Sequence, residues 1–187
     1  MRRTIVIISL LAFFWSNAAS GAPAGGWRDH LSYRRATHVA VTDNEVFCSA
    51  GAGISVFRKK DSSIEKLSKV NGLSDVDITN IKWSEESQVL VVGYANGNLD
   101  IIDRNTIINI SDILRSQIAG SKSINNIMTV GNKAYLSCTF GIVVVNLERH
   151  EVIDTYFLGD AGIRLNINDI AFDGVYLYAA TSSGLYK

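Results

Sequence analysis

Side chains that could do chemistry are few in this 187-residue sequence, and they do not converge. The three histidines, His30, His38 and His150, stand at none of the spacings that hold zinc. The run Gly51–Gly53 begins like a nucleotide-binding loop, but Val56 occupies the place of the third glycine and no helical pattern follows. No Gly-x-Ser-x-Gly motif is present either. We therefore predict no catalytic residue, no metal site and no cofactor, and a protein that is not an enzyme.

Two stretches could bind a ligand through their side chains. Asp75 and Asp77 place two carboxylates in one loop, but the other oxygen ligands of a calcium loop are missing, so an ordinary solvated loop is the preferred interpretation. A second link, residues 111–123, carries a small basic and polar group. If the protein binds an anionic glycan or a partner, we expect the contact there, although an ordinary solvated loop is again the preferred interpretation. The candidate ligand-binding residues are Arg115, Gln117 and Lys122.

These residues lie between segments that repeat along the chain. A pattern of strand, turn and strand surrounds four glycines that are 44, 44 and 43 residues apart: Gly53, Gly97, Gly141 and Gly184. The second copy, Val89–Asp103, has the turn-forming pair Asn-Gly at its tip. Each copy opens with a short strand, and three of the four openings read Ile-x-[Asn/Asp]-Ile. Four short strands at a period of about 40 to 50 residues are typical of a β-propeller blade.

The predicted fold class is all-β, a β-propeller of four-stranded antiparallel blades with about three and a half blades present. The blades are predicted at residues 37–75, 78–113, 124–162 and 167–187. We expect the ring to be truncated, so that residues 25–187 are the N-terminal part of a propeller domain. The alternative is a four-bladed ring in which Trp27–Ser32 supplies the outer strand of the last blade. Because a truncated ring exposes apolar faces and strand edges, residues 25–187 alone are expected to be poorly soluble or to associate.

Residues 1–24 read as a secretory signal peptide. Arg2 and Arg3 precede an uncharged apolar run, Thr4–Trp15, and small residues follow it. The run is shorter than the roughly 20 residues that span a bilayer. We therefore predict an exported chain, without a transmembrane segment after cleavage, in the periplasm or at the outer-membrane cell surface. The 18 basic and 18 acidic residues balance, which gives no reason to expect nucleic-acid binding.

Several residues on the strands are expected to serve the framework. Cys48 and Cys138 fall in the first and third repeats. Strands that are separated by a whole blade do not bring two Cα atoms within the roughly 7 Å that a disulfide requires, so both cysteines are interpreted as small buried apolar residues. His38 lies on an inner strand and could face the central channel, but a packed or solvated histidine is the preferred interpretation.

Several stretches resemble known propeller families. Asn71-Gly72-Leu73-Ser74, followed by Ile78 and Ile81, resembles the repeat of the two-component-regulator propellers, which occur in periplasmic sensor domains of hybrid histidine kinases. A more specific likeness is to the PorZ family of the type IX secretion system. The residues that carry it are Trp27–Tyr33 (WRDHLSY), Leu67–Asp75 (LSKVNGLSD), Gly120–Ile127 (GSKSINNI) and Tyr135–Val144 (YLSCTFGIVV).

The resemblance to the PorZ family implies a non-enzymatic cell-surface component of the type IX secretion attachment complex. Members of that family have two propellers and a C-terminal sorting domain, act with the sortase PorU, and supply anionic lipopolysaccharide for attaching cargo. The PorU sortase and anionic lipopolysaccharide are thus the implied partners. The alternative is the periplasmic sensor propeller of a hybrid two-component histidine kinase. A third possibility, a propeller lyase or glycosidase, lacks converging carboxylates or histidines in this sequence.

Overall fold

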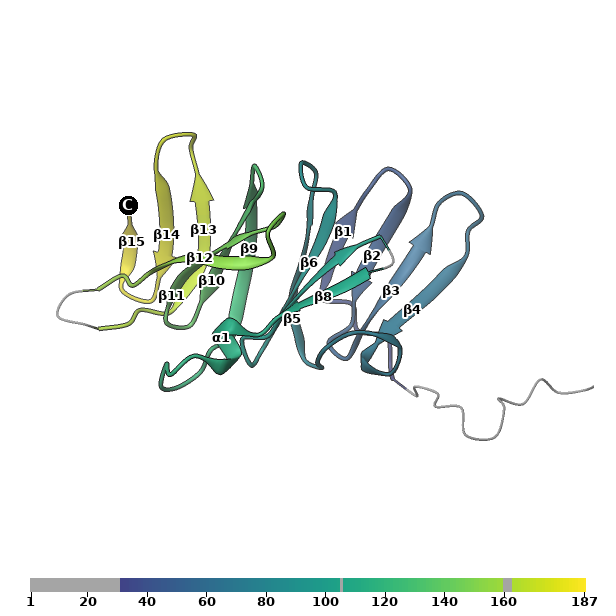
Figure 1. Ribbon diagram of the computed structural model, residues 1–187, viewed down its shortest axis with the longest axis horizontal. Helices are drawn as coiled ribbons and strands as arrows, with labels where there is room; N and C mark the ends of the chain where they lie inside the picture. Colours follow the sequence, from purple (N-terminus) through teal and green to yellow (C-terminus); the bar gives the residue numbers. More distant parts are fainter. Residues whose placement is uncertain (1–30, 105, 160–162) are drawn as a thin grey trace, which may run out of the picture.

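The computed structural model describes residues 31–187 except 105 and 160–162, and these form four antiparallel sheets that follow one another along the chain (Figure 1). In each sheet every strand pairs with the next strand in sequence. The first two sheets contain β1 (His38–Val41), β2 (Glu45–Ser49), β3 (Gly53–Arg58), β4 (Ile64–Ser68), β5 (Ile78–Ser84), β6 (Val89–Tyr94), β7 (Leu99–Asp103) and β8 (Thr106–Ile110). The last two contain β9 (Ile124–Val130), β10 (Lys133–Cys138), β11 (Gly141–Asn146), β12 (Glu151–Tyr156), β13 (Ile167–Phe172), β14 (Leu177–Thr181) and β15 (Gly184–Tyr186).

This arrangement confirms the predicted fold class. Three sheets have four strands and the fourth has three, so the sheets are the blades of a β-propeller. The described residues contain two helices, a 3-10 turn η1 (Lys69–Asn71) and a one-turn helix α1 (Asp112–Arg115), and both lie in links between blades. The first and last blades lie at opposite ends of the molecule, so the blades form an open arc and not a closed ring (Figure 1).

The apolar core is divided into three clusters, one between each pair of successive blades. All six residues of β6 are buried, because this strand lies inside the second blade, which has a neighbour on both sides. Leu90 and Val92 face the first blade, whereas Val89 and Val91 face the third. A continuous apolar run such as VLVVGY is therefore what a strand in an inner blade requires.

A small residue recurs four positions before each anchoring glycine, and the packing explains it. In the second blade this residue is Gly93, and a Cβ atom added there would lie 2.9 Å from Cγ2 of Ile124 in the next blade. Its counterparts Ser49 and Ser137 are fully buried. The small side chain lets the inner strand of the following blade approach closely. The repeat is therefore a requirement of packing between blades.

The two cysteines are both free, but their surroundings differ. Cys138 is fully buried between the second and third blades, and burial raises the pKa of its thiol to about 12. Cys48 is only half-buried, so the expectation of burial was wrong for this residue. It pairs with Val39 on the side of the first blade that no other blade of the described residues contacts.

Thiol labelling should separate the two cysteines. At pH 8 we expect a maleimide to modify Cys48 in the native chain and to leave Cys138 unmodified, because the Cys138 thiol is buried and protonated. Mass spectrometry of the digested protein measures this directly. Labelling in urea is the control and should modify both residues. Equal native labelling of both would contradict the burial of Cys138.

The N-terminal predictions fall mainly on residues that are not described. The proposed signal peptide, residues 1–24, and the first part of the proposed closing strand, Trp27–His30, lie outside the described residues. Leu31 and Ser32, which are described, are not in a strand. Within the described ranges there is no helix of the length and apolar character needed to cross a membrane.

Candidate functional site

The connections between strands lie at two opposite ends of the blades. Short turns occupy one end, and the long links between blades occupy the other, where α1 protrudes (Figure 1). We call this second end the link face and define it as residues 69–77, 111–123, 157–159 and 163–166. Binding residues of propellers are usually carried by such connections, which a rigid set of strands holds in place. The predicted ligand-binding residues belong to this face.

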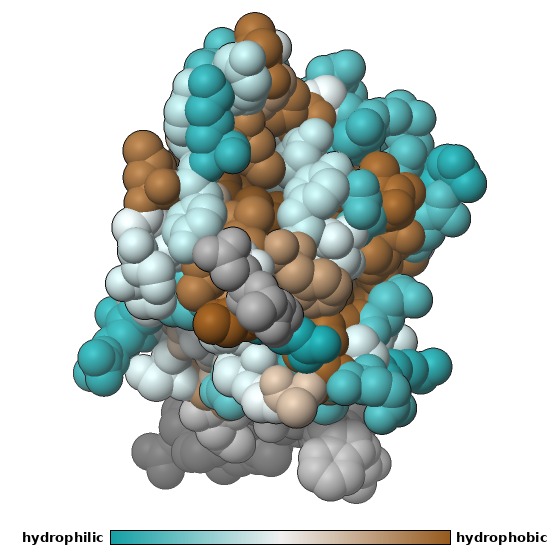
Figure 2. Space-filling view, turned by 90° about the vertical axis from the view of Figure 1, so that its left-hand side faces the viewer, coloured by the Kyte–Doolittle hydropathy of each residue, from teal (hydrophilic) through white to brown (hydrophobic). Residues whose placement is uncertain are grey.

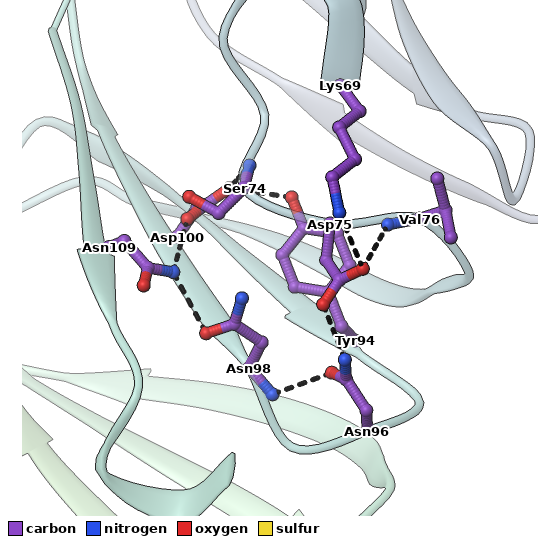
Figure 3. Close-up of polar contacts among 9 residues, drawn as sticks. All are labelled: Lys69, Ser74, Asp75, Val76, Tyr94, Asn96, Asn98, Asp100 and Asn109. Atoms are coloured by element: carbon purple, nitrogen blue, oxygen red, sulfur yellow. Dashed lines mark hydrogen bonds and ion pairs between the residues drawn. The ribbon is translucent and has the colours of Figure 1, made fainter. Parts of the chain in front are cut away.

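A buried carboxylate fixes the first link to the second blade. Asp100 on β7 has no exposed surface. It accepts a hydrogen bond from the Ser74 backbone N–H at 2.8 Å and another from the Tyr94 hydroxyl at 2.6 Å (Figure 3). A third comes from Asn109 Nδ2 on β8 at 2.9 Å. Burial of the Tyr94 phenol raises its pKa, and the hydrogen bond to Asp100 and the negative charge of Asp100 raise it further. The phenol therefore remains a hydrogen-bond donor.

Asp75 makes a second, more exposed set of contacts in the same link (Figure 3). Its carboxylate accepts hydrogen bonds from the Val76 backbone N–H at 2.9 Å and from Asn96 Nδ2, and Lys69 Nζ lies 3.5 Å away. Burial opposes ionisation, but these bonds and the lysine charge outweigh it and lower the pKa of Asp75. The carboxylate therefore holds the link against the Asn96-Gly97 turn. Nowhere in the described ranges do three or more His, Cys, Asp or Glu side chains gather as metal ligands would.

The second link contains the three predicted ligand-binding residues, and it places them differently. Arg115, the last residue of α1, and Gln117 are exposed to solvent. Lys122 is half-buried, and its Nζ donates hydrogen bonds to the Leu114 carbonyl at 2.8 Å and the Ser116 carbonyl at 2.7 Å. The lysine thus neutralises the C-terminal end of α1. Arg115 and Gln117 are free to reach a ligand, whereas Lys122 would have to share or give up these bonds.

The hairpin that carries the Asn-Gly turn supports this second link. Gly97 has a φ of +86° and is buried. A Cβ atom at this position would lie 2.8 Å from Ile113 Cγ2 and 2.9 Å from the Lys122 carbonyl oxygen. Glycine is therefore needed here both for the turn and for contact with the link. Ile113 is itself buried in the core between the second and third blades, which anchors α1.

A row of polar side chains runs along the inner strands, at the Asn/Asp position of the recurring Ile-x-[Asn/Asp]-Ile motif, for which the sequence alone predicts no role. Asn80 Nδ2 on β5 donates to Asn126 Oδ1 on β9 at 3.2 Å, and Asn126 Nδ2 donates to Asp169 Oδ1 on β13. We call this row the amide ladder. His38 occupies the same position on β1, because it pairs with Ser49 as Asn80 pairs with Gly93. His38 is half-buried, and among the described residues its Nδ1 has no hydrogen-bond partner.

The remaining candidates for chemistry stay apart from one another. Gly51–Gly53 forms the turn between β2 and β3, and His150 lies in the turn before β12. Trp83 stacks on Phe47 with 6.4 Å between the ring centroids, within the contact between the first two blades. His30 lies outside the described residues. Those candidates that lie among the described residues therefore do not share one site.

The fold places the chain in the class of β-propeller proteins whose long connections lie on one face. The sequence further assigns it to one family of β-propellers. A family model described as the type IX secretion (TSS9) PorZ N-terminal β-propeller domain matches residues 34–187. The chain belongs to this family. The resemblance to PorZ given by the sequence is thereby confirmed.

Solved structures agree with this assignment. PorZ of Porphyromonas gingivalis, described as an essential bacterial surface component of the type IX secretion system, is 25% identical with a TM-score of 0.73, over 83% of this chain and 20% of that chain. An extracellular domain described as part of a hybrid two-component system of B. thetaiotaomicron is 15% identical with a TM-score of 0.65, over 81% and 20%. The computationally designed protein Ika4 is 13% identical with a TM-score of 0.60, over 81% and 89%.

The two natural structures are much longer than the segment that matches them. The chain spans about a fifth of the length of the PorZ and sensor chains. At 15% identity the likeness to the sensor domain is one of fold. No curated protein matches the sequence significantly.

Proposed function

We propose that this chain is a non-enzymatic binding module of the type IX secretion attachment complex, exported to the periplasm or the outer-membrane cell surface. In this proposal it contacts anionic lipopolysaccharide, the PorU sortase, or both. The observation that carries the proposal is the family match over residues 34–187. The surface location described for the P. gingivalis relative supports export.

The link face is the proposed binding surface. Arg115 and Gln117 belong to a link that Ile113 and Gly97 hold against the core, so a ligand would meet an exposed guanidinium and amide on an anchored backbone. A guanidinium binds phosphate and carboxylate groups with paired hydrogen bonds, which suits an anionic glycolipid. On the next link Arg164 lies over the Phe157 ring at 5.2 Å and adds a second cation to this face. Lys122 contributes positive charge while it stabilises α1.

Charge reversal at Arg115 tests this surface. We expect Arg115→Glu to weaken binding of residues 25–187 to vesicles that contain anionic lipopolysaccharide at least about tenfold, since each basic residue near an anionic surface contributes about 1 kcal/mol and the reversal changes the charge by two units. Surface plasmon resonance on captured vesicles gives the affinity. Lys133→Glu is the matched control, because Lys133 is exposed at the start of β10, at the opposite end of the strands. Equal losses in the two variants would argue against a site on the link face.

A pull-down with purified PorU tests the second partner. Retention of the sortase by residues 25–187, with loss in a link-face variant, would support a protein contact. Binding to neither the vesicles nor the sortase would remove the functional proposal and leave the fold unchanged. The sensor alternative predicts a membrane span and a histidine kinase domain in the same gene product, and finding these would favour it.

A further inference from the structure

A groove of about 720 Å³ lies between the first and second blades, and we call it the interblade groove. Its volume falls within the roughly 300 to 1,000 Å³ of ligand-binding clefts in proteins. Apolar side chains are also exposed at the fourth-blade end of the molecule (Figure 2), but both walls of this groove belong to blades that contact each other. Its floor consists of apolar residues of the core between these blades: Phe47, Val56, Leu67, Trp83, Ile102 and Ile107.

Two aromatic rings distinguish this gap from the gap between the second and third blades. Phe47 stands six residues before its anchoring glycine, where the second blade has Val91. Trp83 occupies on β5 the place that Thr129 occupies on β9. The two rings stack with an interplanar angle of 13°. Because they are bulkier than valine and threonine, they hold the walls of the gap further apart than the smaller side chains would.

The indole of Trp83 also provides a hydrogen-bond donor that no described residue uses. Its Nε1 atom is buried and has no acceptor within the described ranges. A buried indole N–H usually has a hydrogen-bond partner. A carbonyl oxygen from a ligand in the groove would supply the missing acceptor.

Charged side chains surround this apolar floor. Glu45 stands eight residues before its anchoring glycine, where the second blade has Val89, a core residue that is only 4% exposed. Glu45 lies 3.8 Å from Arg58, which also pairs with Glu65. The rim has more carboxylates than guanidinium groups and is therefore acidic. Its charged residues are Asp43, Glu45, Arg58, Glu65, Glu85 and Arg104.

Two of the rim carboxylates are available to a ligand. Neither Asp43 nor Glu85 forms an ion pair with any described residue. Glu85 follows Trp83 by two positions, and both residues line the groove. A carboxylate and an indole ring each attract a cation, the ring through the negative potential of its face. The groove therefore combines an apolar floor with a rim that favours positive charge.

We infer that the interblade groove binds an extended peptide segment of a partner protein in which basic side chains alternate with apolar ones. Side chains of an extended chain point alternately to opposite sides, so the apolar ones would cover the floor while the basic ones meet the rim. A peptide carbonyl would accept the hydrogen bond of Trp83 Nε1. The lining continues from Asn44, in the turn before β2, to Asn71 in η1, so the groove follows the length of the gap.

This site is separate from the proposed binding surface on the second link. It contains neither Arg115 nor Gln117, and its acidic rim would repel anionic lipopolysaccharide. The inference therefore does not depend on the proposed function. Either one can fail while the other holds.

Trp83 provides its own assay for peptide binding. In residues 25–187, Trp27→Phe leaves Trp83 as the only tryptophan. The probe is the acetylated and amidated pentapeptide Leu-Arg-Leu-Arg-Leu, which spans about 17 Å when extended and so matches the five residues of β4. We expect a saturable change in Trp83 emission. The same peptide with citrulline, a neutral analogue of arginine, should bind at least about fivefold more weakly, since it loses both cations.

Two adjacent glutamates give a matched pair of variants in the same Trp27→Phe background. Glu85→Gln should weaken binding of the arginine peptide about threefold to fivefold, which is the usual effect of one partly exposed ion pair. Glu86→Gln is the control, because Glu86 is also exposed but does not line the interblade groove, and it should leave the affinity unchanged. Circular dichroism verifies that both variants keep their strands.

Several results would overturn the inference. These are no response to the arginine peptide, equal affinities for the arginine and citrulline peptides, or equal effects of Glu85→Gln and Glu86→Gln. A change in Trp83 emission with anionic lipopolysaccharide but not with the peptide would assign the groove to that ligand, and would also overturn the inference. None of these outcomes changes the result expected for Arg115→Glu on vesicles.

Discussion

Asp100→Ala is expected to lower the free energy of unfolding by about 3 to 5 kcal/mol, which is among the largest effects of any single substitution in this chain. The carboxylate is fully buried and satisfies three donors, the Ser74 N–H, the Tyr94 hydroxyl and Asn109 Nδ2. Its removal leaves the Ser74 N–H and the Tyr94 hydroxyl without this acceptor in the interior, whereas Asn109 Nδ2 keeps its bonds to Asn98 Oδ1 and the Leu99 carbonyl. Urea unfolding followed by circular dichroism measures the change, and a loss of Ser74 amide protection should accompany it.

Asp103→Ala provides the control for Asp100→Ala. Asp103 is the last residue of the same strand, β7, and is exposed, so its substitution should change the free energy of unfolding by less than about 0.5 kcal/mol. If the two variants were equally stable, the buried carboxylate would not hold the first link to the second blade.

Gly141→Ala is expected to cost about 3 to 5 kcal/mol for a different reason, the close approach of two backbones. Gly141 begins β11 with a φ of +152°, which side-chain-bearing residues rarely adopt. A Cβ atom there would lie 2.4 Å from the Tyr156 carbonyl oxygen on β12. The added methyl group must therefore strain the backbone and separate the two strands. Thermal and urea unfolding of the variant measure the cost.

Gly174→Ala separates these two contributions. Gly174 also has a positive φ, +100°, but a Cβ atom there would meet nothing within 4 Å. This variant should lose only the conformational term, about 1 kcal/mol. A Gly141→Ala variant no less stable than Gly174→Ala would show that the approach to Tyr156 is not limiting.

The blade architecture was predictable because its determinants are local in sequence. The spacing of Gly53, Gly97, Gly141 and Gly184 gives the period, and turn-forming residues between apolar runs give the strands. The small residues before these glycines were visible as a repeat, although their purpose appeared only with the distance between Gly93 and Ile124. Local signals thus determine which segments form strands and how many blades result.

The roles of polar residues were not predictable, because their partners lie far away in sequence. Asp100 alternates with apolar residues in LDIID as a solvent-facing residue would, and its contact with Ser74 joins positions 26 apart. The sequence predicts a solvent-exposed charge at Lys122, but its Nζ donates hydrogen bonds to two backbone carbonyl groups of the same link. Cys48 has the apolar neighbours of a core residue in the sequence, but it lies on the face of the first blade that no other described blade contacts, so it is only half-buried.

The pairing of every strand with its neighbour in sequence has a consequence for how the molecule folds. Contacts that are close along the chain form quickly, because little chain entropy is lost when the intervening loop closes. Each blade can therefore assemble as a unit, and stability then accumulates from contacts between adjacent units, as in a linear repeat array. Among the described blades, the first and the fourth each contact one other blade, and units held from one side only open first. The outer blades should therefore exchange their amide hydrogens before the two in the middle.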